Sequence, residues 1–285
     1  MRNSNTNQKK KCPGIRSLVP KSKIEILSQL IGGKMGTYRV RAQHRVHYLT
    51  IPTNVFDEDT MCHPHLLIPK LPDFPDADWT TMRISRGATR LLKSTISYDP
   101  LPTIQTWHPQ TIEVLSLTQL KRHRSNVHEV LYKGHPAISK IACFEWDIRR
   151  IENETWAYSI ISQHQHPGES AIAPNVLGHL TENGRVIGFL LEKIDGKFAS
   201  IDDLPKCEKA LRRLHGLGLV HGDVNRYNFI VDRPDGHVRI VDFEHAEVFD
   251  KRKAYVELES LASELVEETG RGGPTVEISQ LQKNV

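Results

Sequence analysis

The segment at residues 217–246 constrains the fold of this chain of 285 residues more than any other part of the sequence. Residues 229–232 and 238–241 are short runs rich in β-branched and aromatic residues, and the turn-forming run Arg-Pro-Asp-Gly-His separates them. The pattern predicts a β-hairpin. Such a hairpin brings Asn228, directly before its first strand, close to Asp242, directly after its second strand.

The polar residues at the mouth of this hairpin are of the kinds that bind a divalent cation. One carboxylate and one amide oxygen form a hard-oxygen pair suited to Mg²⁺, which keeps its remaining coordination positions for water and substrate phosphates. Asp223 precedes Asn228 in the chain and is offset from the metal ligands, so it is free to accept a proton. The segment therefore predicts a nucleotide-phosphate site.

The two motifs stand in the sequence as HGDVNRYN (residues 221–228) and DFE (residues 242–244). They resemble the catalytic loop, usually written H-R-D-x-x-x-x-N, and the D-F-G motif of the protein-kinase-like superfamily. The resemblance implies that Asp223 orients or deprotonates an acceptor hydroxyl while Asn228 and Asp242 hold Mg²⁺ beside ATP. The HGD and DFE forms are similar to those of aminoglycoside, choline and other small-molecule kinases and of the atypical kinases.

A lysine and a glutamate upstream fit the same interpretation. The apolar strand AISKIA carries Lys140 on the same face as Ile138, because strand side chains alternate. A lysine in an apolar strand is costly unless its ammonium meets an anion, and the resemblance supplies the α- and β-phosphates and a helix glutamate. Residues 147–161 predict a helix, in which Glu154 is our choice for the partner of Lys140 and Glu152 is the competitor.

The segment VIGFLLEKI resembles the strand that leads to the hinge between the two lobes of a kinase-like fold. By this resemblance Leu191 backs an adenine pocket. The Glu192 carbonyl and the Ile194 amide face the adenine edge, and Ile138 joins Lys140 in the nucleotide-binding set.

Each of the central residues also has an ordinary structural explanation. Asp223 follows a glycine, as turn aspartates do; Lys140 could protect a sheet edge; and Glu154 could lie on a solvated helix face. Taken singly, these explanations are the better ones. The order of the motifs along the chain, with a predicted helix at residues 200–217 directly before the catalytic loop, favours the kinase-like interpretation.

Two departures from the family pattern bear on function. Strands are predicted at residues 111–117 and 127–132, but their connection, residues 118–126, holds no glycine, so its backbone amides approach phosphates less closely. Asn225 stands where Ser/Thr kinases often place a lysine, so phosphate neutralisation could fall to Arg226 or be weaker. The basic side chains of the connection could substitute by charge or form a solvated turn: Lys121, Arg122 and Arg124.

The part of the sequence after Asp242 is short for this family. A helix is predicted at residues 253–268, no A-P-E motif is found, and little chain is left for the platform on which protein kinases seat peptides. Three interpretations stay open: a minimal atypical protein kinase, a small-molecule phosphotransferase and, from another class, a pseudokinase that binds nucleotide or a partner protein without turnover. In either enzyme the acceptor is an unidentified protein or small-molecule hydroxyl.

The N-terminal third is less regular. Residues 38–51 predict a β-hairpin, and residues 53–109 predict a proline-rich loop with a short helix near residues 88–94. This extension, followed by Trp107-His-Pro and a degenerate kinase-like domain, is similar to fungal kinase-like proteins often labelled "alpha-galactosidase A precursor". The label gains no support, because a retaining glycosidase needs a carboxylate pair across a sugar site.

We therefore expect an α+β protein with a two-lobed protein-kinase-like fold and a short C-lobe, preceded by a β-containing extension. Its expected parts are a disordered basic tail (1–22), an accessory region with a β-hairpin and a proline-rich loop (23–110), an N-lobe with the hinge (111–194), a short C-lobe with the catalytic loop (195–270) and a flexible tail (271–285).

The composition predicts a soluble protein of the cytoplasm or nucleus. Hydrophobic residues make up 38% of the chain, enough for a core, and no segment approaches the roughly 20 apolar residues that span a bilayer. The net charge is +4 without basic and aromatic clustering, which argues against nucleic acid as a partner. The cysteines are widely scattered, which argues against disulfides. The runs Cys62-His-Pro-His65 and His164-Gln-His166 lack matching zinc-type spacing and predict surface loops.

Overall fold

The computed structural model describes residues 17–87, 89–164, 168–270 and 273. Within these residues the chain mixes α-helices with several β-sheets, which confirms the expected α+β class. Most of the expected N-terminal tail and nearly all of the expected C-terminal tail lie outside the described residues, as does part of the run His164-Gln-His166.

The chain divides into two compact units, Met1–Pro100 and Leu101–Val285, which are described separately. The boundary expected from the sequence lies after residue 110, whereas residues 101–110 group with the C-terminal unit.

A five-stranded sheet frames the N-terminal unit, with the strand order β2-β3-β4-β6-β7. The strands are β2 (Ile24–Ile31), β3 (Met35–Ala42), β4 (Arg45–Pro52), β6 (Thr81–Arg86) and β7 (Leu92–Ser97). β3 and β4 pair antiparallel, which confirms the hairpin predicted at residues 38–51. Short elements complete the unit: β1 (Leu18–Val19), which pairs with β5 (Phe74–Pro75), and the helices α1 (Glu58–Cys62) and α2 (Pro64–Leu67).

The proline-rich region is more regular than the sequence predicts. The helix expected near residues 88–94 is wrong, because the described part of this range is a turn that leads into β7. In β6, Met82 and Ile84 are fully buried at strand spacing. The prediction of a long proline-rich loop is also wrong, because Pro64 and Pro69 stand in the first turns of short helices. The backbone N–H that a proline lacks has no partner within a helix at that position, so proline is tolerated there.

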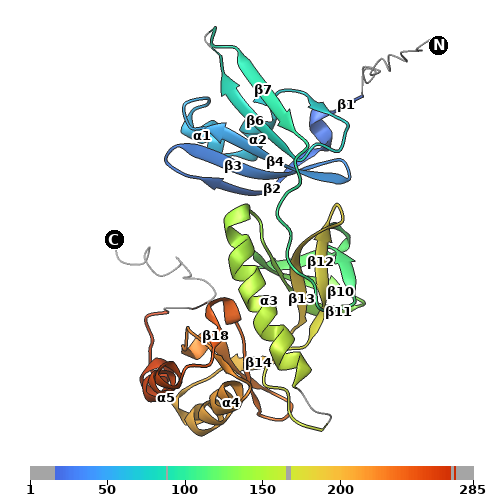
Figure 1. Ribbon diagram of the computed structural model, residues 1–285. Coiled ribbons are helices and arrows are strands. Elements are labelled where there is room, and N and C mark those ends of the chain that lie inside the picture. The colour runs from blue at the N-terminus through green and yellow to red at the C-terminus, as the bar shows by residue number, and fades with distance from the viewer. Residues whose placement is uncertain (1–16, 88, 165–167, 271–272, 274–285) are drawn as a thin grey trace, which may run out of the picture. The chain divides into compact units, whose positions relative to one another are not determined.

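A six-stranded sheet and a long helix form the first part of the C-terminal unit. The strand order is β8-β12-β13-β11-β10-β9. The strands are β8 (Thr111–Glu113), β9 (Thr118–Arg122), β10 (Val127–Tyr132), β11 (His135–Ile141), β12 (Val176–Glu182) and β13 (Arg185–Glu192). Helix α3 (Ile148–Gln163) runs alongside this sheet (Figure 1). The predicted helix at 147–161 and the strands at 127–132, 137–142 and 186–194 are therefore confirmed.

The predicted strand at residues 111–117 is wrong in extent. β8 pairs in parallel with β12 at one edge of the sheet, a 3-10 turn (Val114–Ser116) follows, and β9 lies at the opposite edge. Much of the predicted connection (118–126) is therefore strand, and the turn into β10 is confined to residues 123–126. Every residue of β9 is exposed, so its sequence lacks the alternation that marks a half-buried strand.

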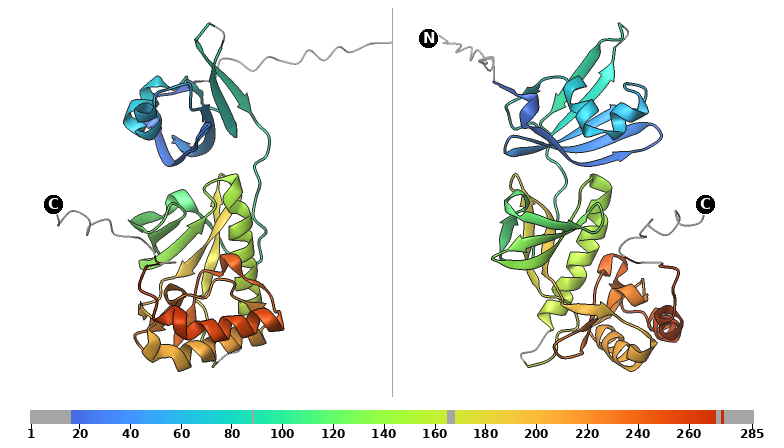
Figure 2. Two further views of the ribbon diagram at one scale, coloured as in Figure 1. Left: turned by 90° about the vertical axis from the view of Figure 1, so that its left-hand side faces the viewer. Right: turned by 180° about the vertical axis from the view of Figure 1, so that it is seen from behind.

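Two helices and two small sheets complete the described part of the C-terminal unit, and Figure 2 shows their arrangement from two further sides. β16 (Phe229–Asp232) and β17 (Val238–Ile240) form the predicted hairpin, and β14 (Gly196–Phe198) pairs with β16. β15 (Leu219–Val220) pairs with β18 (Glu247–Val248). The remaining helices are α4 (Leu204–Gly216) and α5 (Lys251–Leu265), which confirm the helices predicted at 200–217 and 253–268.

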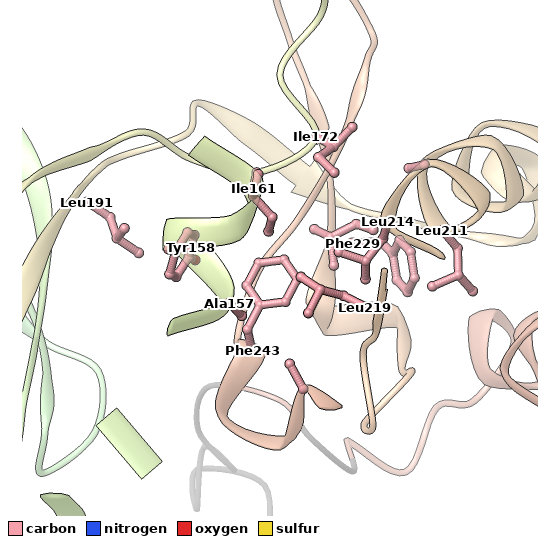
Figure 3. Close-up of a cluster of buried hydrophobic side chains, with 14 of the residues drawn as sticks. Ala157, Tyr158, Ile161, Ile172, Leu191, Leu211, Leu214, Leu219, Phe229 and Phe243 are labelled. Carbon is pink, nitrogen blue, oxygen red and sulfur yellow. The ribbon is translucent and has the colours of Figure 1, made fainter. Parts of the chain in front are cut away.

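One hydrophobic core connects α3 with the hairpin and α4. Figure 3 shows Phe243 among side chains of these elements, with Tyr158 on one side and Leu219 on the other. The rings of Tyr158 and Phe243 meet edge to face, with their centroids 5.1 Å apart. This core fixes the position of the DFE motif relative to α3.

Among the described residues, no helix combines the length and apolar character needed to cross a membrane. Cys62, Cys143 and Cys207 are free thiols.

Leu214 lies in α4 with its side chain fully buried in this core. We expect Leu214→Ala to lower the free energy of unfolding by about 2 to 5 kcal/mol, because it leaves a cavity. Leu120→Ala on exposed β9 is the matched control and should change it by less than about 0.5 kcal/mol. Urea unfolding measures both, and equal losses would contradict the core described above.

Candidate functional site

A cavity of about 480 Å³ opens beside β11 and the residues that follow β13. Its size falls within the range of small-molecule and cofactor sites. The predicted site residues that line it are Ile138, Lys140, Leu191, Glu192, Ile194, Asn228 and Asp242. The structure thus brings together residues from three parts of the sequence that the motifs singled out.

Lys140 is the charged centre of this cavity. Its Nζ donates to Glu154 Oε1 and to Asp242 Oδ1, each at 2.7 Å. The side chain of Glu154 is 2% exposed and that of Lys140 is 10% exposed. The predicted pairing of Lys140 with Glu154 is therefore confirmed, and Glu152, the competitor, lines a different cavity between α3 and residues 105–107.

Glu154 and Asp242 share the Lys140 ammonium at a buried site, and this arrangement determines which of the two carboxyl groups is ionised. Burial opposes the charge of Lys140, but Glu154 and Asp242 raise its pKa above the usual value. Burial also opposes ionisation of Asp242, yet the charge and hydrogen bond of Lys140 keep the pKa of that carboxyl below its usual range. Burial raises the pKa of Glu154 to about 7, against the opposing effect of Lys140. Asp242 is therefore the carboxylate that stays ionised.

Backbone geometry at the DFE motif directs Asp242 into the cavity. Asp242 has φ of 68°, in the left-handed region that non-glycine residues seldom adopt. Helix α3 fixes the residues that follow: Glu154 Oε1 accepts from Phe243 N–H at 3.3 Å, and Asn153 Nδ2 donates to the carbonyls of Glu244 and Ala246. The unusual conformation is thus held from outside the motif, as strained residues at functional sites commonly are.

Asp223 lies beside the cavity rather than in its lining. Asn228 Nδ2 donates to the Asp223 carbonyl at 2.8 Å, and Asn225 Nδ2 donates to Asp223 Oδ2 at 3.1 Å. Val241 N–H donates to the Asn228 carbonyl at 2.9 Å, which joins the two ends of the hairpin next to Asp242. The predicted convergence of Asn228 and Asp242 at the hairpin mouth is therefore present.

A buried glutamate that the sequence did not single out supports the loop before Asp223. Glu257 in α5 accepts from Gly222 N–H at 2.6 Å and bonds to His215 Nε2 at 2.7 Å. These bonds outweigh burial and lower the pKa of Glu257. Gly222 has φ of +80°, and a Cβ there would lie 2.0 Å from the His245 carbonyl oxygen, so only glycine fits. The available signal was an acidic residue on the apolar face of the predicted helix.

The basic side chain that lies at the cavity is not the one predicted to neutralise phosphate charge. Arg226 does not line the cavity; its Nη1 donates to the Glu267 carbonyl at 3.4 Å. Arg124, in the turn between β9 and β10, lines it instead, with Nη1 3.5 Å from Asp242 Oδ2. Lys121 and Arg122 are exposed on β9. Of the three lysine and arginine side chains in this connection, Arg124 is therefore the one at the cavity, next to His123 in the same turn.

The histidine-containing runs form no metal site in the part of the chain that the structure describes. No group of three or more His, Cys, Asp or Glu side chains is arranged there to hold a metal ion. His63 and His65 are exposed, as predicted; His63 caps the junction between α1 and α2, and His65 lies in α2 rather than in a loop.

No protein-family model matches the sequence, and no curated protein is significantly similar to it. The functional assignment of this site therefore depends on its own geometry.

The pKa of Glu154 is directly testable. We expect a glutamic acid that titrates near pH 7, seen as an infrared carboxyl signal in wild-type protein and lost in Glu154→Gln. Because the folded pKa is above the unfolded value of 4.5, ionisation of Glu154 destabilises the fold as pH rises from 4.5 through 7. Wild-type protein should therefore lose stability relative to Glu154→Gln across that window.

Glu152→Gln is the matched control for this experiment, since the same helix carries both glutamates. It should keep the signal near pH 7. A wild-type protein whose glutamates all titrate in the ordinary range near 4.3 would contradict the assigned environment.

Proposed function

We propose that the C-terminal unit binds ATP with Mg²⁺ and transfers the γ-phosphoryl group to a protein or small-molecule hydroxyl. In this proposal the unit is a member of the protein-kinase-like superfamily. The six-stranded sheet with α3 is its N-lobe, and the hairpin with α4 and α5 is a short C-lobe. The single observation that carries the proposal is the Lys140 ammonium, held at 2.7 Å from both Glu154 and Asp242 at the wall of the cavity.

The donor set fits a magnesium nucleotide. Asn228 and Asp242 line one wall with amide and carboxylate groups, which are oxygen ligands of the kind that Mg²⁺ accepts. Ile138 and Leu191 line the cavity with apolar surface suited to a base. The Tyr158 hydroxyl also lies in this lining, buried and without a hydrogen-bond partner among the described residues, so a ligand or water can satisfy it.

The residues of the chain would divide the work by charge and position. When bound, Mg²⁺ would neutralise phosphate charge and orient the transferring group. Lys140 would hold the phosphates, with Glu154 keeping the ammonium in place. Asp223, fixed by Asn225 and Asn228, would orient the acceptor hydroxyl and take its proton.

A catalytically inactive nucleotide-binding module is the second candidate, and one contact favours it. Arg124 Nη1 lies 3.5 Å from the Asp242 carboxylate that also binds Lys140. Two cations already face the proposed metal ligand, and a metal ion must compete with them. In that candidate nucleotide or partner binding persists without phosphoryl transfer.

We also propose that the protein resides in the cytoplasm or nucleus. Free Cys62, Cys143 and Cys207 suit the reducing conditions of these compartments.

The acceptor of the phosphoryl group is either a protein or a metabolite. Analysis of radiolabelled products in a cell extract would distinguish the two.

A MgATP titration with three variants tests this function. Wild-type protein should gain about 2.7 kcal/mol of stability at a ligand concentration of 100 times Kd. Asp242→Asn should lose the Mg²⁺-dependent part of this gain. Asp223→Asn should keep the binding and form ADP about 10²- to 10⁴-fold more slowly. The control Asp235→Asn, exposed in the turn of the hairpin, should behave as wild type.

The outcomes separate the two candidates. Binding by wild-type protein that yields neither ADP nor labelled product, even when a cell extract supplies acceptors, would support the inactive module. No MgATP binding at all would refute the nucleotide site, and ADP formation that survives both Asp242→Asn and Asp223→Asn would refute the residue roles.

A further inference from the structure

The segment that precedes β8, residues 101–110, is built into the C-terminal unit. Ile104 is 2% exposed, lies in the main core and donates its N–H to the Val186 carbonyl at 3.1 Å. Arg185 Nη1 donates to the Pro102 carbonyl at 2.9 Å. The segment is therefore held along β13 before it reaches the helix.

A buried histidine anchors the next residues. His179 in β12 is fully buried, and its Nε2 accepts the backbone N–H groups of Trp107 at 3.0 Å and His108 at 3.2 Å. Burial lowers the pKa of His179, so the ring is neutral and Nε2 is free to accept. The Trp107 indole is edge-on to this ring, with centroids 5.9 Å apart.

From this anchor Trp107 reaches α3. Its Nε1–H donates to Thr155 Oγ1 at 2.9 Å, and Thr155 is 3% exposed. Three consecutive residues of α3 therefore have fixed partners: Asn153 binds the backbone after the DFE motif, Glu154 binds Lys140, and Thr155 binds Trp107. Successive helix residues are about 100° apart around the axis. These three bonds together leave the helix little freedom to rotate.

We propose that Trp107 is a positioning residue that, through Thr155, sets the rotation of α3 at which Glu154 pairs with Lys140. Residues 101–110, which follow the N-terminal unit in the sequence, thereby hold helix α3, whose Glu154 pairs with Lys140. We call these residues the strap. This inference rests on the proposed function for its effect on MgATP, but the strap itself can be tested without nucleotide.

The experiment uses the full chain with two substitutions that remove the same hydrogen bond from opposite ends. Trp107→Phe keeps an aromatic ring and loses the N–H, while Thr155→Val keeps the shape and loses the hydroxyl. Trp156→Phe is the matched control, because it makes the same change in α3 itself, at a residue that lines the same cavity as Trp107.

The first measurement is the acylation rate of Lys140 in nucleotide-free protein, read by mass spectrometry. A net hydrogen bond contributes about 0.5 to 1.5 kcal/mol. We therefore expect Trp107→Phe and Thr155→Val each to raise the Lys140 rate about 2- to 10-fold. The rate at exposed Lys193 should stay unchanged in every variant, and Trp156→Phe should leave both rates unchanged.

The second measurement compares two ligands. Each strap variant should weaken Kd for MgATP by about 2- to 10-fold and leave Kd for adenosine unchanged, because adenosine carries no phosphate for Lys140. A general loss of structure would weaken both. The double variant should match the single variants, since the same bond is lost in all three.

The results are decisive in either direction. Unchanged Lys140 acylation in both Trp107→Phe and Thr155→Val would overturn the strap, as would effects that multiply in the double variant. If Trp107→Phe misfolds, Thr155→Val decides alone. Faster Lys140 acylation in a protein that does not bind MgATP would uphold the strap and refute the proposed function.

Discussion

A single buried ammonium between two carboxylates is the interaction on which the C-terminal unit depends. Lys140 joins β11 to α3 through Glu154 and to the end of the hairpin through Asp242. Taking such charges out of water costs several kcal/mol per ion, and hydrophobic residues of similar volume are often at least as stabilising. Stability alone is therefore a poor reason for this arrangement. A charged cluster with shifted pKa values at a cavity wall is better evidence for binding or catalysis.

The parts of this site that the sequence predicts are those where a polar residue interrupts an apolar pattern. Lys140 stands in an apolar strand, and Asn228 and Asp242 flank a hydrophobic hairpin, so local alternation and turn chemistry were sufficient to locate them. The support of the site comes from contacts between distant segments. Glu257 binds Gly222 from α5, and Trp107 reaches Thr155 across 48 positions of the chain. The position of Glu257 on an apolar helix face marks it as unusual, but a single sequence does not indicate which distant residue it contacts.

The errors elsewhere have equally physical causes. Prolines at the starts of helices resemble prolines in loops, which concealed the short helices of the N-terminal unit. β9 is a strand because it pairs with β10, although its own residues show no buried face. For Arg124 the sequence left open a charge beside the phosphates or a solvated turn, and the structure places its guanidinium at Asp242, in the turn at residues 123–126. For the prolines the local signal was ambiguous, whereas for β9 and Arg124 tertiary contacts outweighed the local pattern.

The placement of β9 has a consequence for the behaviour of the protein in concentrated solution. An edge strand offers unpaired backbone groups to any other extended chain and so invites intermolecular β-sheet growth. Lys121 and Arg122 put two positive charges on this exposed edge. A second copy that met this edge with its own β9 would bring further positive charge to it, and such repulsion disfavours aggregation. The residues that stand where the family pattern has a glycine-rich loop therefore oppose edge-to-edge association of this sheet.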